Sequence, residues 1–450
     1  MSLNFLHNKW FKFSIWALLY FAWVIWLGNY WWLLGLAVIF DLYITKRVRW
    51  AFWRKKVEPG RRQKAWVEWV DAIIFALVAA TFIRTFFIEA YTIPTGSMEK
   101  SLLVGDYLFV SKVTYGPKVP QTPLSFPLVH NVMPLFGGES YSTAIQNEYR
   151  RLKGYSKVKR DDIVVFGFPH GDTVLKALPQ DDYYQIVRIN NNNRAYTRKM
   201  YGPVVVRPND KKDNYVKRCV AVAGDTLTVV NGNVIVNGVP QKEYEGLQST
   251  YTVYTNGSSI NPKILENAGL NPDELYFDSS LPGYPEMTLT RAELAKIESL
   301  GIVVEIRENI DVYPPDFPDS PIMLFPFVED FKWTRDNYGP IWVPAKGSTV
   351  KLTVENLPLY ERIITAYEGN TLSVDGSNIY INGSIAGEYT FKQDYFFMMG
   401  DNRHHSLDSR YWGFVPEDHI VGTPAMVWFS TDKSKSFPSN IRWKRLFKFV

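Results

Sequence analysis

Ser97 is a candidate nucleophile because of the turn on which it lies. It stands between Gly96 and Met98, and Pro94 together with Gly96 should make the chain bend sharply there. A serine on such a turn can present its hydroxyl for attack on a carbonyl, although serines at turns more often cap a helix or stabilise the turn. A serine nucleophile also needs a neighbouring base, so the next step is to find one.

Histidine is the usual base, but the six histidines of this chain form no familiar catalytic pattern. No GxSxG elbow surrounds Ser97, and the sequence contains no HExxH motif. His404 and His405 stand beside Asp401 and Asp408, which suggests a metal site or a serine triad. Adjacent residues of a strand point to opposite faces, however, so the two imidazoles could not easily bind one ion. We expect no metal and no cofactor.

Lys217 is the alternative base. It lies in an apolar run, and on a strand it would share a face with Cys219, Ala221 and Ala223 while Arg218 points away. To accept a proton near neutral pH, its pKa must fall from about 10.4 by roughly three units, and desolvation on an apolar face can cause that fall. A lysine that snorkels to the sheet edge is the more ordinary interpretation. We expect the lone cysteine, Cys219, to be a core residue.

A third segment, residues 396–416, concentrates polar side chains between apolar flanks. Its polar residues are Asp401, Asn402, Arg403, Ser406, Asp408, Ser409 and Arg410. Buried charges need partners, so this pattern indicates an internally paired loop or a functional site. A solvated surface loop is the alternative.

Together and in this order, after an apolar anchor, the three segments resemble bacterial type I signal peptidases, the membrane-bound serine proteases that remove signal peptides. Residues 94–98 read Pro-Thr-Gly-Ser-Met, which matches the serine box of that family. Lys217 and Arg218 precede a Gly-Asp pair, as in its lysine box. Residues 400–410 fill every named position of its Gly-Asp-Asn-Arg-x-x-Ser-x-Asp-Ser-Arg box.

The resemblance implies a mechanism. Ser97 would attack the scissile carbonyl while neutral Lys217 takes its proton, and the Ser97 backbone N–H with the Thr95 hydroxyl would hold the oxyanion. Substrates of the family carry small side chains at the first and third positions before the cut, which suits a face lined by Ala221 and Ala223. An extended substrate could pair as an added strand.

The resemblance also assigns supporting roles within the third box. Ser406 would orient the lysine amine, and the Asp408–Arg410 pair would brace the loop. His404 and His405 replace an Asp-Asn pair that is common in the family, so they inherit no role.

The elements that must position these residues are mainly strands. After residue 90, short apolar runs of period two are separated by Gly, Asn and Pro, and Asn-Gly pairs at 231 and 237 predict tight hairpins. The fold class is therefore mainly β, an antiparallel β-sheet catalytic domain with N-terminal transmembrane helices and a mixed insertion. The expected strands cover residues 106–113, 162–168, 215–224 and 226–239.

Residues 215–238 align without gaps on residues 360–383, with nine identities in 24. Lys217 aligns with Arg362, which cannot act as a base, so a second copy would have no equivalent base. A chance similarity of two hairpins is the alternative.

Between the two stretches, Thr290 and Glu293 form the capping box of a predicted helix. Residues 313–326 are rich in proline and are expected to be extended and solvent-facing.

The N-terminal segment predicts a membrane anchor. Residues 14–44 contain one charge, and residues 28–30 divide them into two apolar helices of about 15 to 17 residues, unless they form one long tilted span. Residues 66–88 form a further apolar segment. The stretch 46–64 holds nine Lys or Arg against one Glu, and the positive-inside rule places it in the cytoplasm. A cleaved signal peptide is the alternative for residues 1–30, but no small-x-small site follows them.

Charge and cysteine content exclude other classes. The net charge of +5 arises from that basic stretch, because the rest of the chain sums to −3, so a uniformly basic nucleic-acid binder is excluded. A single cysteine permits no intrachain disulfide. The expected partners are exported preproteins with their signal peptides, and membrane lipid, with no nucleic acid.

The sequence thus predicts a serine endopeptidase in the bacterial cytoplasmic (inner) membrane, multi-pass, with its catalytic domain on the extracytoplasmic side. Self-cleaving repressors share the dyad but lack the anchor and the third box. A membrane-tethered binding module without catalysis is the other alternative, and the joint presence of Ser97, Lys217 and Ser406 argues against it. The predicted parts are an anchor with a cytoplasmic basic loop (1–89), the catalytic domain (90–239 and 350–450) and an insertion of unknown role (240–349).

Overall fold

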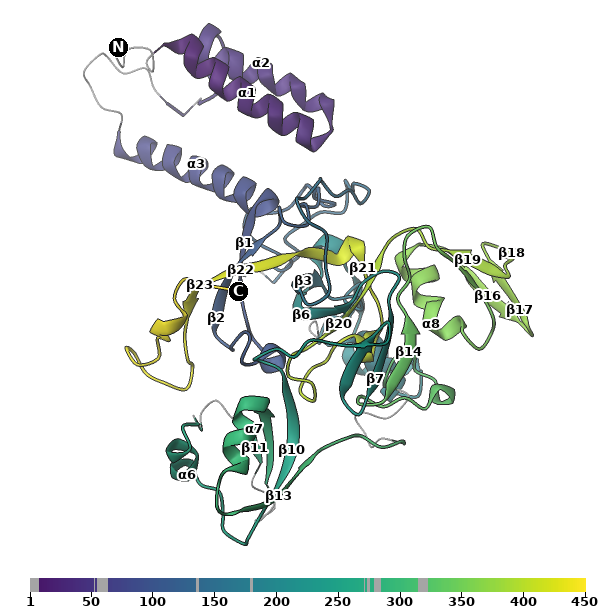
Figure 1. Cartoon of the computed structure of the whole chain (residues 1–450). Coiled ribbons are helices and arrows are strands. Elements are labelled where there is room, and N and C mark those ends of the chain that lie inside the picture. Colours follow the sequence, from purple (N-terminus) through teal and green to yellow (C-terminus); the bar gives the residue numbers. More distant parts are fainter. Residues whose placement is uncertain are drawn as a thin grey trace.

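The chain has N-terminal helices, a β-rich body and a small sheet domain below the body (Figure 1). This computed structural model describes residues 8–51, 53–54, 64–134, 137–178, 181–270, 272, 276–278, 285–314 and 323–450.

The first apolar segment forms a helical hairpin, as one of the two alternatives predicts. Helix α1 (Lys9–Leu27) ends where Gly28 adopts a φ of 66°, a left-handed conformation that suits glycine at a helix C-cap. The chain then runs back alongside α1 in shorter helical pieces (Figure 1), namely η2 (Tyr30–Leu34), α2 (Gly35–Phe40) and η3 (Asp41–Thr45). Helix α3 (Ala65–Phe86) matches the second apolar segment.

Among the described helices, α1 and α3 are long and apolar enough to cross a membrane. They meet near their C-terminal ends, where Trp23 packs against Phe82 and Phe86 with ring centroids 5.8 and 5.9 Å apart. The indole of Trp26 donates to the Lys153 carbonyl at 3.1 Å. The hairpin is therefore tied both to α3 and to the body.

The body is built on one antiparallel sheet, which confirms the predicted fold class. The strand order is β1-β2-β22-β3-β6-β20-β21, and β23 pairs with β22. In β2 the side chains of Asp106, Leu108 and Val110 are buried while their neighbours are half-exposed, as period-two strands require. The bounds are β1 (Ile88–Thr92), β2 (Asp106–Ser111), β3 (Ile163–Gly167), β6 (Asn214–Ala221), β20 (Tyr395–Met399), β21 (Val415–Pro416), β22 (Ile420–Ser430) and β23 (Lys448–Phe449).

The predicted Asn-Gly hairpins form a second sheet. Asn231 and Asn237 have φ values of 46° and 52°, followed by glycines at 76° and 78°, the positive pair that a type I′ turn requires. The strands are β7 (Thr226–Val230), β8 (Asn233–Val236) and β9 (Val239–Pro240). Strand β14 (Tyr338–Trp342) pairs with β7, so the end of the range expected to be an insertion joins this sheet.

The internal similarity holds for the hairpin alone. Residues 372–385 form β16 (Leu372–Asp375), β17 (Asn378–Ile381) and β18 (Ser384–Ile385), which matches the first copy. The stretch that aligns with strand β6 is helical instead, in α8 (Leu357–Arg362) and η8 (Ile363–Tyr367). Its apolar residues recur at helical spacing, and Leu357, Tyr360 and Ile364 are buried on one side of it. Arg362 and Lys217 therefore occupy different elements.

A small domain follows the second sheet and has its own core. Its strand order is β11-β12-β10-β13, with β10 (Gln248–Thr255), β11 (Tyr276–Asp278), β12 (Glu286–Thr290) and β13 (Val303–Glu308). Helices α6 (Pro262–Asn267) and α7 (Arg291–Glu298) cover it, and α7 begins with the predicted capping box of Thr290 and Glu293. Val253, Leu265, Leu289 and Ile297 form part of its core.

The expectation of a solvent-facing proline-rich stretch is wrong at its end. Met323, Leu324 and Phe325 are buried, and the Phe325 ring packs against Phe414 at 5.6 Å. Burial of these three apolar side chains lowers the free energy of the fold relative to their exposure to water. Residues 315–322 lie outside the described residues.

Shorter elements complete the fold. They are β4 (Thr173–Leu175), α4 (Tyr183–Ile189), α5 (Arg194–Tyr201), β5 (Val204–Val206), β15 (Thr349–Lys351), β19 (Glu388–Thr390) and α9 (Ser409–Trp412), with the short helices η4 (Gly96–Met98), η5 (Asn209–Lys211), η7 (Glu329–Phe331), η9 (Glu417–His419) and η10 (Trp443–Arg445).

Candidate active site

Ser97 lies on the one-turn helix η4, which follows edge strand β1. The turn is fixed by its apolar neighbours, since Ile93 and Met98 are buried against β2 and β22 in one cluster. Ile93 is also bonded to the backbone of Asp106, because its amide donates to that carbonyl at 2.9 Å. Ser97 is therefore held at the end of β1 as the predicted sharp turn requires.

The structure brings Ser97 and Lys217 together. The Lys217 Nζ lies 2.6 Å from the Ser97 Oγ and 3.2 Å from the Val216 carbonyl oxygen. Lys217 is only 3 % exposed on strand β6. Burial lowers its pKa to about 8, against a smaller opposing effect of Asp408 and Asp401. An amine with this pKa reaches its neutral form at mildly alkaline pH and can then accept the serine proton.

Asp401, which follows Gly400 in the third box, is engaged by residues other than Lys217. Asp401 binds Arg218, whose Nε and Nη2 donate to its two oxygens at 2.7 and 2.6 Å, and it also accepts from the Ser101 hydroxyl at 2.5 Å. Arg218 points to the opposite side of β6 from Lys217, as the alternation of a strand predicts. Among the described residues, the Lys217 amine therefore has no direct carboxylate partner, and burial keeps its pKa low.

The Gly-Asp-Asn-Arg box forms a buried, internally paired loop beneath Ser97. The Arg410 guanidinium donates to both oxygens of Asp408 at 2.9 and 2.8 Å, and the Gly400 amide donates to Asp408 at 3.1 Å. Burial alone would raise the pKa of Asp408, but Arg410 holds it below its ordinary value. A side chain at Gly400 would place its Cβ 2.6 Å from the Ser97 carbonyl oxygen, so only glycine fits there.

Ser406 is placed differently from what the resemblance implies. Its hydroxyl is buried beside Gly400 and close enough to Asp408 to help lower the pKa of that carboxyl, and it makes no hydrogen bond to the Lys217 amine within the described part of the chain. Cys219 of β6 is buried in the core, as expected, and burial raises the pKa of its thiol.

A cleft of about 640 Å³ opens in front of the dyad. Its walls are two consecutive stretches, residues 89–95 around β1 and residues 213–217 of β6, and Thr95 lines it together with the dyad. Within the described part of the chain, β1 is an edge strand. Strand β6 pairs with β3 on one side and with β20 on the other, but β20 pairs only with the second half of β6. In the ranges that the structure describes, the first half of β6 therefore has one edge without a partner strand. Two strand edges therefore face this cleft.

The apolar lining of this cleft is not among the residues that the sequence motifs indicate. It is made by Ala90, Ile93, Met98, Val165 and Val216. Ala221, which was expected to line a substrate-binding face, is fully buried in the core, and Ala223 lines a separate cavity beside Tyr115. The reason is that β6 enters the core beyond Lys217, so that only its first half borders the cleft. The alternation of β1 could have indicated Ala90 as a lining residue.

Comparisons with known proteins identify the family of this chain. The sequence profile of the family described as signal peptidase, peptidase S26, matches residues 66–276 and 346–429, which include all three boxes. Signal peptidase I of Buchnera aphidicola (subspecies Acyrthosiphon pisum) is 25% identical over 407 residues, covering 88% of this chain and 85% of the relative. Signal peptidase I of Helicobacter pylori strain 26695 is 24% identical over 393 residues, covering 85% and 91%. The chain belongs to the signal peptidase, peptidase S26, family and is a serine endopeptidase.

Proposed function

We propose that this enzyme removes signal peptides from exported preproteins, with Ser97 as nucleophile and neutral Lys217 as general base. The observation that carries the proposal is the 2.6 Å contact between the Lys217 Nζ and the Ser97 Oγ, buried at the floor of an open cleft. A lysine can replace histidine as base because burial brings its pKa to about 8.

The reaction has two halves. In the first, the Ser97 Oγ attacks the carbonyl carbon of the scissile bond, its proton passes to the Lys217 Nζ, and the same proton then goes to the leaving amine as the peptide bond breaks. The Ser97 N–H stands at the start of a helix, where backbone amides have no intrahelical partner, and it would hold the oxyanion with the Thr95 hydroxyl. In the second half, Lys217 takes a proton from a water molecule, whose oxygen attacks the acyl carbonyl carbon. The bond from that carbon to the Ser97 Oγ then breaks, and Lys217 returns the proton to the Oγ.

Three residues of the third box support the dyad in this proposal. The Asp408–Arg410 pair braces the loop on which the Ser97 main chain rests. Ser406 would orient the Lys217 amine if its hydroxyl turned from Asp408 toward that amine.

The substrate would bind as an extended strand between the facing edges of β1 and β6. Main-chain hydrogen bonds to these edges do not depend on sequence, whereas the apolar lining near Ser97 includes Ala90, Ile93 and Val216 and favours small side chains near the cut. The prediction of small residues before the cleavage site thus stays, with a different set of lining residues.

The membrane arrangement is part of the proposal. Helices α1 and α3 are the candidate spans, and the basic stretch between them would lie in the cytoplasm of a bacterium, with the enzyme in its inner membrane. Residues after 88 would then be extracytoplasmic, and Ser97 follows the last residue of α3, Phe86, by only eleven positions. The dyad would therefore lie near the membrane surface. The division into catalytic and inserted parts stays a prediction, with β14 assigned to the catalytic part because it pairs with β7.

Incubation of the purified full-length enzyme in detergent with a preprotein tests the proposal. Wild type should release the mature protein, and Ser97→Ala, Lys217→Ala and Lys217→Arg should all be inactive, because arginine keeps the charge but does not lose its proton. Cleavage by Ser97→Ala would exclude the serine mechanism. Binding of the preprotein without cleavage by wild type would favour the binding-module alternative.

Protease protection in spheroplasts tests the orientation. The extracytoplasmic body should be digested by added protease, whereas an epitope in the basic stretch should survive until the membrane is lysed. The reverse pattern would contradict the orientation.

A further inference from the structure

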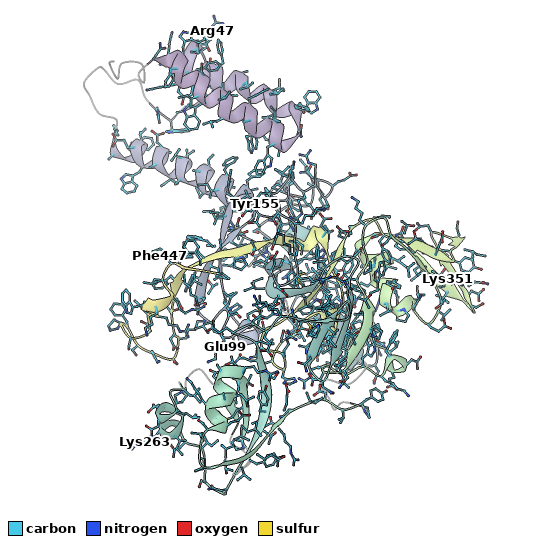
Figure 2. All side chains as sticks on the ribbon, viewed as in Figure 1. Arg47, Glu99, Tyr155, Lys263, Lys351 and Phe447 are labelled. Atoms are coloured by element: carbon cyan, nitrogen blue, oxygen red, sulfur yellow. The ribbon has the colours of Figure 1, made fainter. Side chains whose placement is uncertain are left out.

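The small domain contacts the body at the loop that carries the Gly-Asp-Asn-Arg box. The Gln248 amide, at the start of β10, donates to the Asp401 carbonyl at 2.9 Å, and the Arg403 amide donates to the Gln248 carbonyl at 3.0 Å. Figure 2 shows Glu99, two residues after Ser97, at the level where this domain meets the body. The nearby Lys100 ammonium pairs with Glu293 of α7 at 2.9 Å. The domain therefore contacts both segments that surround the catalytic serine.

His404 lies at the centre of this contact. Its Nδ1 accepts the Thr250 backbone N–H of β10 at 3.0 Å, and its Nε2 lies 3.0 and 3.1 Å from the two oxygens of Asp336. An N–H donor to Nδ1 requires that the ring proton sits on Nε2, where it is donated to the carboxylate. The imidazole is 6 % exposed and Asp336 is 1 % exposed. One buried ring thus joins the loop to β10 on one side and to the segment before β14 on the other.

The loop is in turn bonded to the catalytic serine. The Asn402 amide donates to the Ser97 carbonyl at 3.1 Å, and its side-chain Nδ2 donates to the Gly96 carbonyl at 3.3 Å. Only Arg403 separates Asn402 from His404 in the chain. A displacement of the loop at His404 would therefore displace the main chain that carries Ser97.

We infer that His404 is a positioning residue, which locks the loop onto the small domain and thereby fixes the Ser97 backbone relative to Lys217. This rests on the proposed function of Ser97 and Lys217. It gives the small domain a role, because its strand β10 supplies the N–H that holds the ring, and it accounts for a histidine at a position where resemblance alone implies no role. His405 adds a contact, since its Nε2 lies 3.1 Å from the Thr288 hydroxyl of β12.

Substitutions can separate the two bonds of the ring. The Oδ1 of His404→Asn can stand where Nδ1 stands and accept the Thr250 N–H, which keeps the loop attached to β10. In His404→Gln the side-chain Nε2 can reach Asp336, but the Thr250 N–H loses its hydrogen-bond acceptor. His404→Ala loses both bonds. The inference predicts the order of kcat as wild type, His404→Asn, His404→Gln, His404→Ala.

The experiment measures kcat and KM for a preprotein or a signal-peptide substrate with the full-length enzyme. His404→Ala should lower kcat by about tenfold to a hundredfold, the effect of a displacement of the order of 1 Å, with KM changed less than twofold. KM should hold because His404 does not line the cleft. His404→Asn should restore most of kcat.

Leu265→Ala is the matched control for lost stability. Leu265 is buried in the core of the same domain on α6, which also carries Lys263 and lies on the outer side of the domain (Figure 2). This variant should lower the Tm at least as much as His404→Ala and leave kcat unchanged. Equal losses of kcat in the two variants would mean that His404 acts through stability alone, which would overturn the inference. A wild-type kcat in His404→Ala would overturn it as well. Activity that survives in Ser97→Ala would overturn the proposed function itself, which distinguishes the two failures.

Discussion

The rate of cleavage should rise with pH across the pKa of the buried Lys217 amine, because only the neutral amine can accept the Ser97 proton. With a pKa of about 8, about one amine in ten is neutral at pH 7. With the ordinary pKa of 10.5, about one in three thousand would be neutral. Burial of Lys217 therefore accounts for about 300-fold in rate at neutral pH by raising the fraction of active enzyme.

The assay is kcat/KM against pH from 6 to 10 with the full-length enzyme in detergent, since this parameter reports ionisations of the free enzyme. We expect a tenfold rise per pH unit below about 8 and a plateau above it. A second buried lysine offers a matched control. Burial also lowers the pKa of Lys212 to about 8, but its Nζ lies 2.7 Å from the His419 Nε2 and does not contact Ser97. Lys212→Met should keep the profile of the wild type.

Two results would refute the assignment. A profile that still rises at pH 10 would show that Lys217 keeps an ordinary pKa, so that burial does not activate it. A rise that disappears in Lys212→Met would assign the ionisation to the Lys212–His419 pair instead of the dyad.

Three further outcomes follow from the packing of the site. Gly400→Ala should lower kcat by about a hundredfold in the preprotein assay, because its Cβ would stand 2.6 Å from the Ser97 carbonyl oxygen and displace the serine; a wild-type kcat would contradict that close contact. Asp408→Asn should destabilise the enzyme by about 3 to 5 kcal/mol in denaturant unfolding, because it leaves the buried Arg410 charge unpaired, and a loss below about 1 kcal/mol would mean that water compensates it. Cys219 should be inert to a thiol reagent in the native enzyme and react once per chain after unfolding, because burial raises its pKa; fast native labelling would contradict this.

Local signals in the sequence predicted those elements whose structure depends on a few neighbouring residues. The Asn-Gly turns at 231 and 237 and the capping box at Thr290 act over two to four positions, and the structure has all three. The alternation along β6 likewise predicted that Lys217 and Arg218 point to opposite sides. In each case the physical cause lies within one turn or one strand, so it can be read without tertiary information.

Contacts between distant segments could not be read in this way. The pairing of Arg218 with Asp401 joins positions 183 apart, and the buried place of Phe325 depends on Phe414. The helix at residues 357–367 departs from the alignment with β6, because its apolar residues recur at helical spacing. The cleft was predicted on the wrong half of β6, since only the three-dimensional sheet order shows which strand edge is free.

The lowered pKa of Lys217 has an opposite consequence for stability. Because the folded state disfavours the protonated amine, the charge destabilises the fold in full at pH values below about 8, and the penalty fades as pH rises toward 10.5, where the amine of the unfolded chain also loses its proton. At pH 7 the difference between the two pKa values corresponds to about 3 kcal/mol. The hydrogen bond between Lys217 and Ser97 offsets about 1 kcal/mol of this destabilisation.

Lys217→Met, which is inactive but similar in shape, should therefore be more stable than wild type by about 2 kcal/mol at pH 7. The gain should shrink close to nothing or reverse near pH 10.5, because the amine is then neutral in the folded state and half neutral in the unfolded chain. Chemical unfolding of both proteins at the two pH values measures this, and groups that titrate alike in both cancel in the difference. A variant that is less stable than wild type at pH 7 would mean that the Lys217 charge is compensated in the fold, and the same compensation would remove its capacity to act as a base.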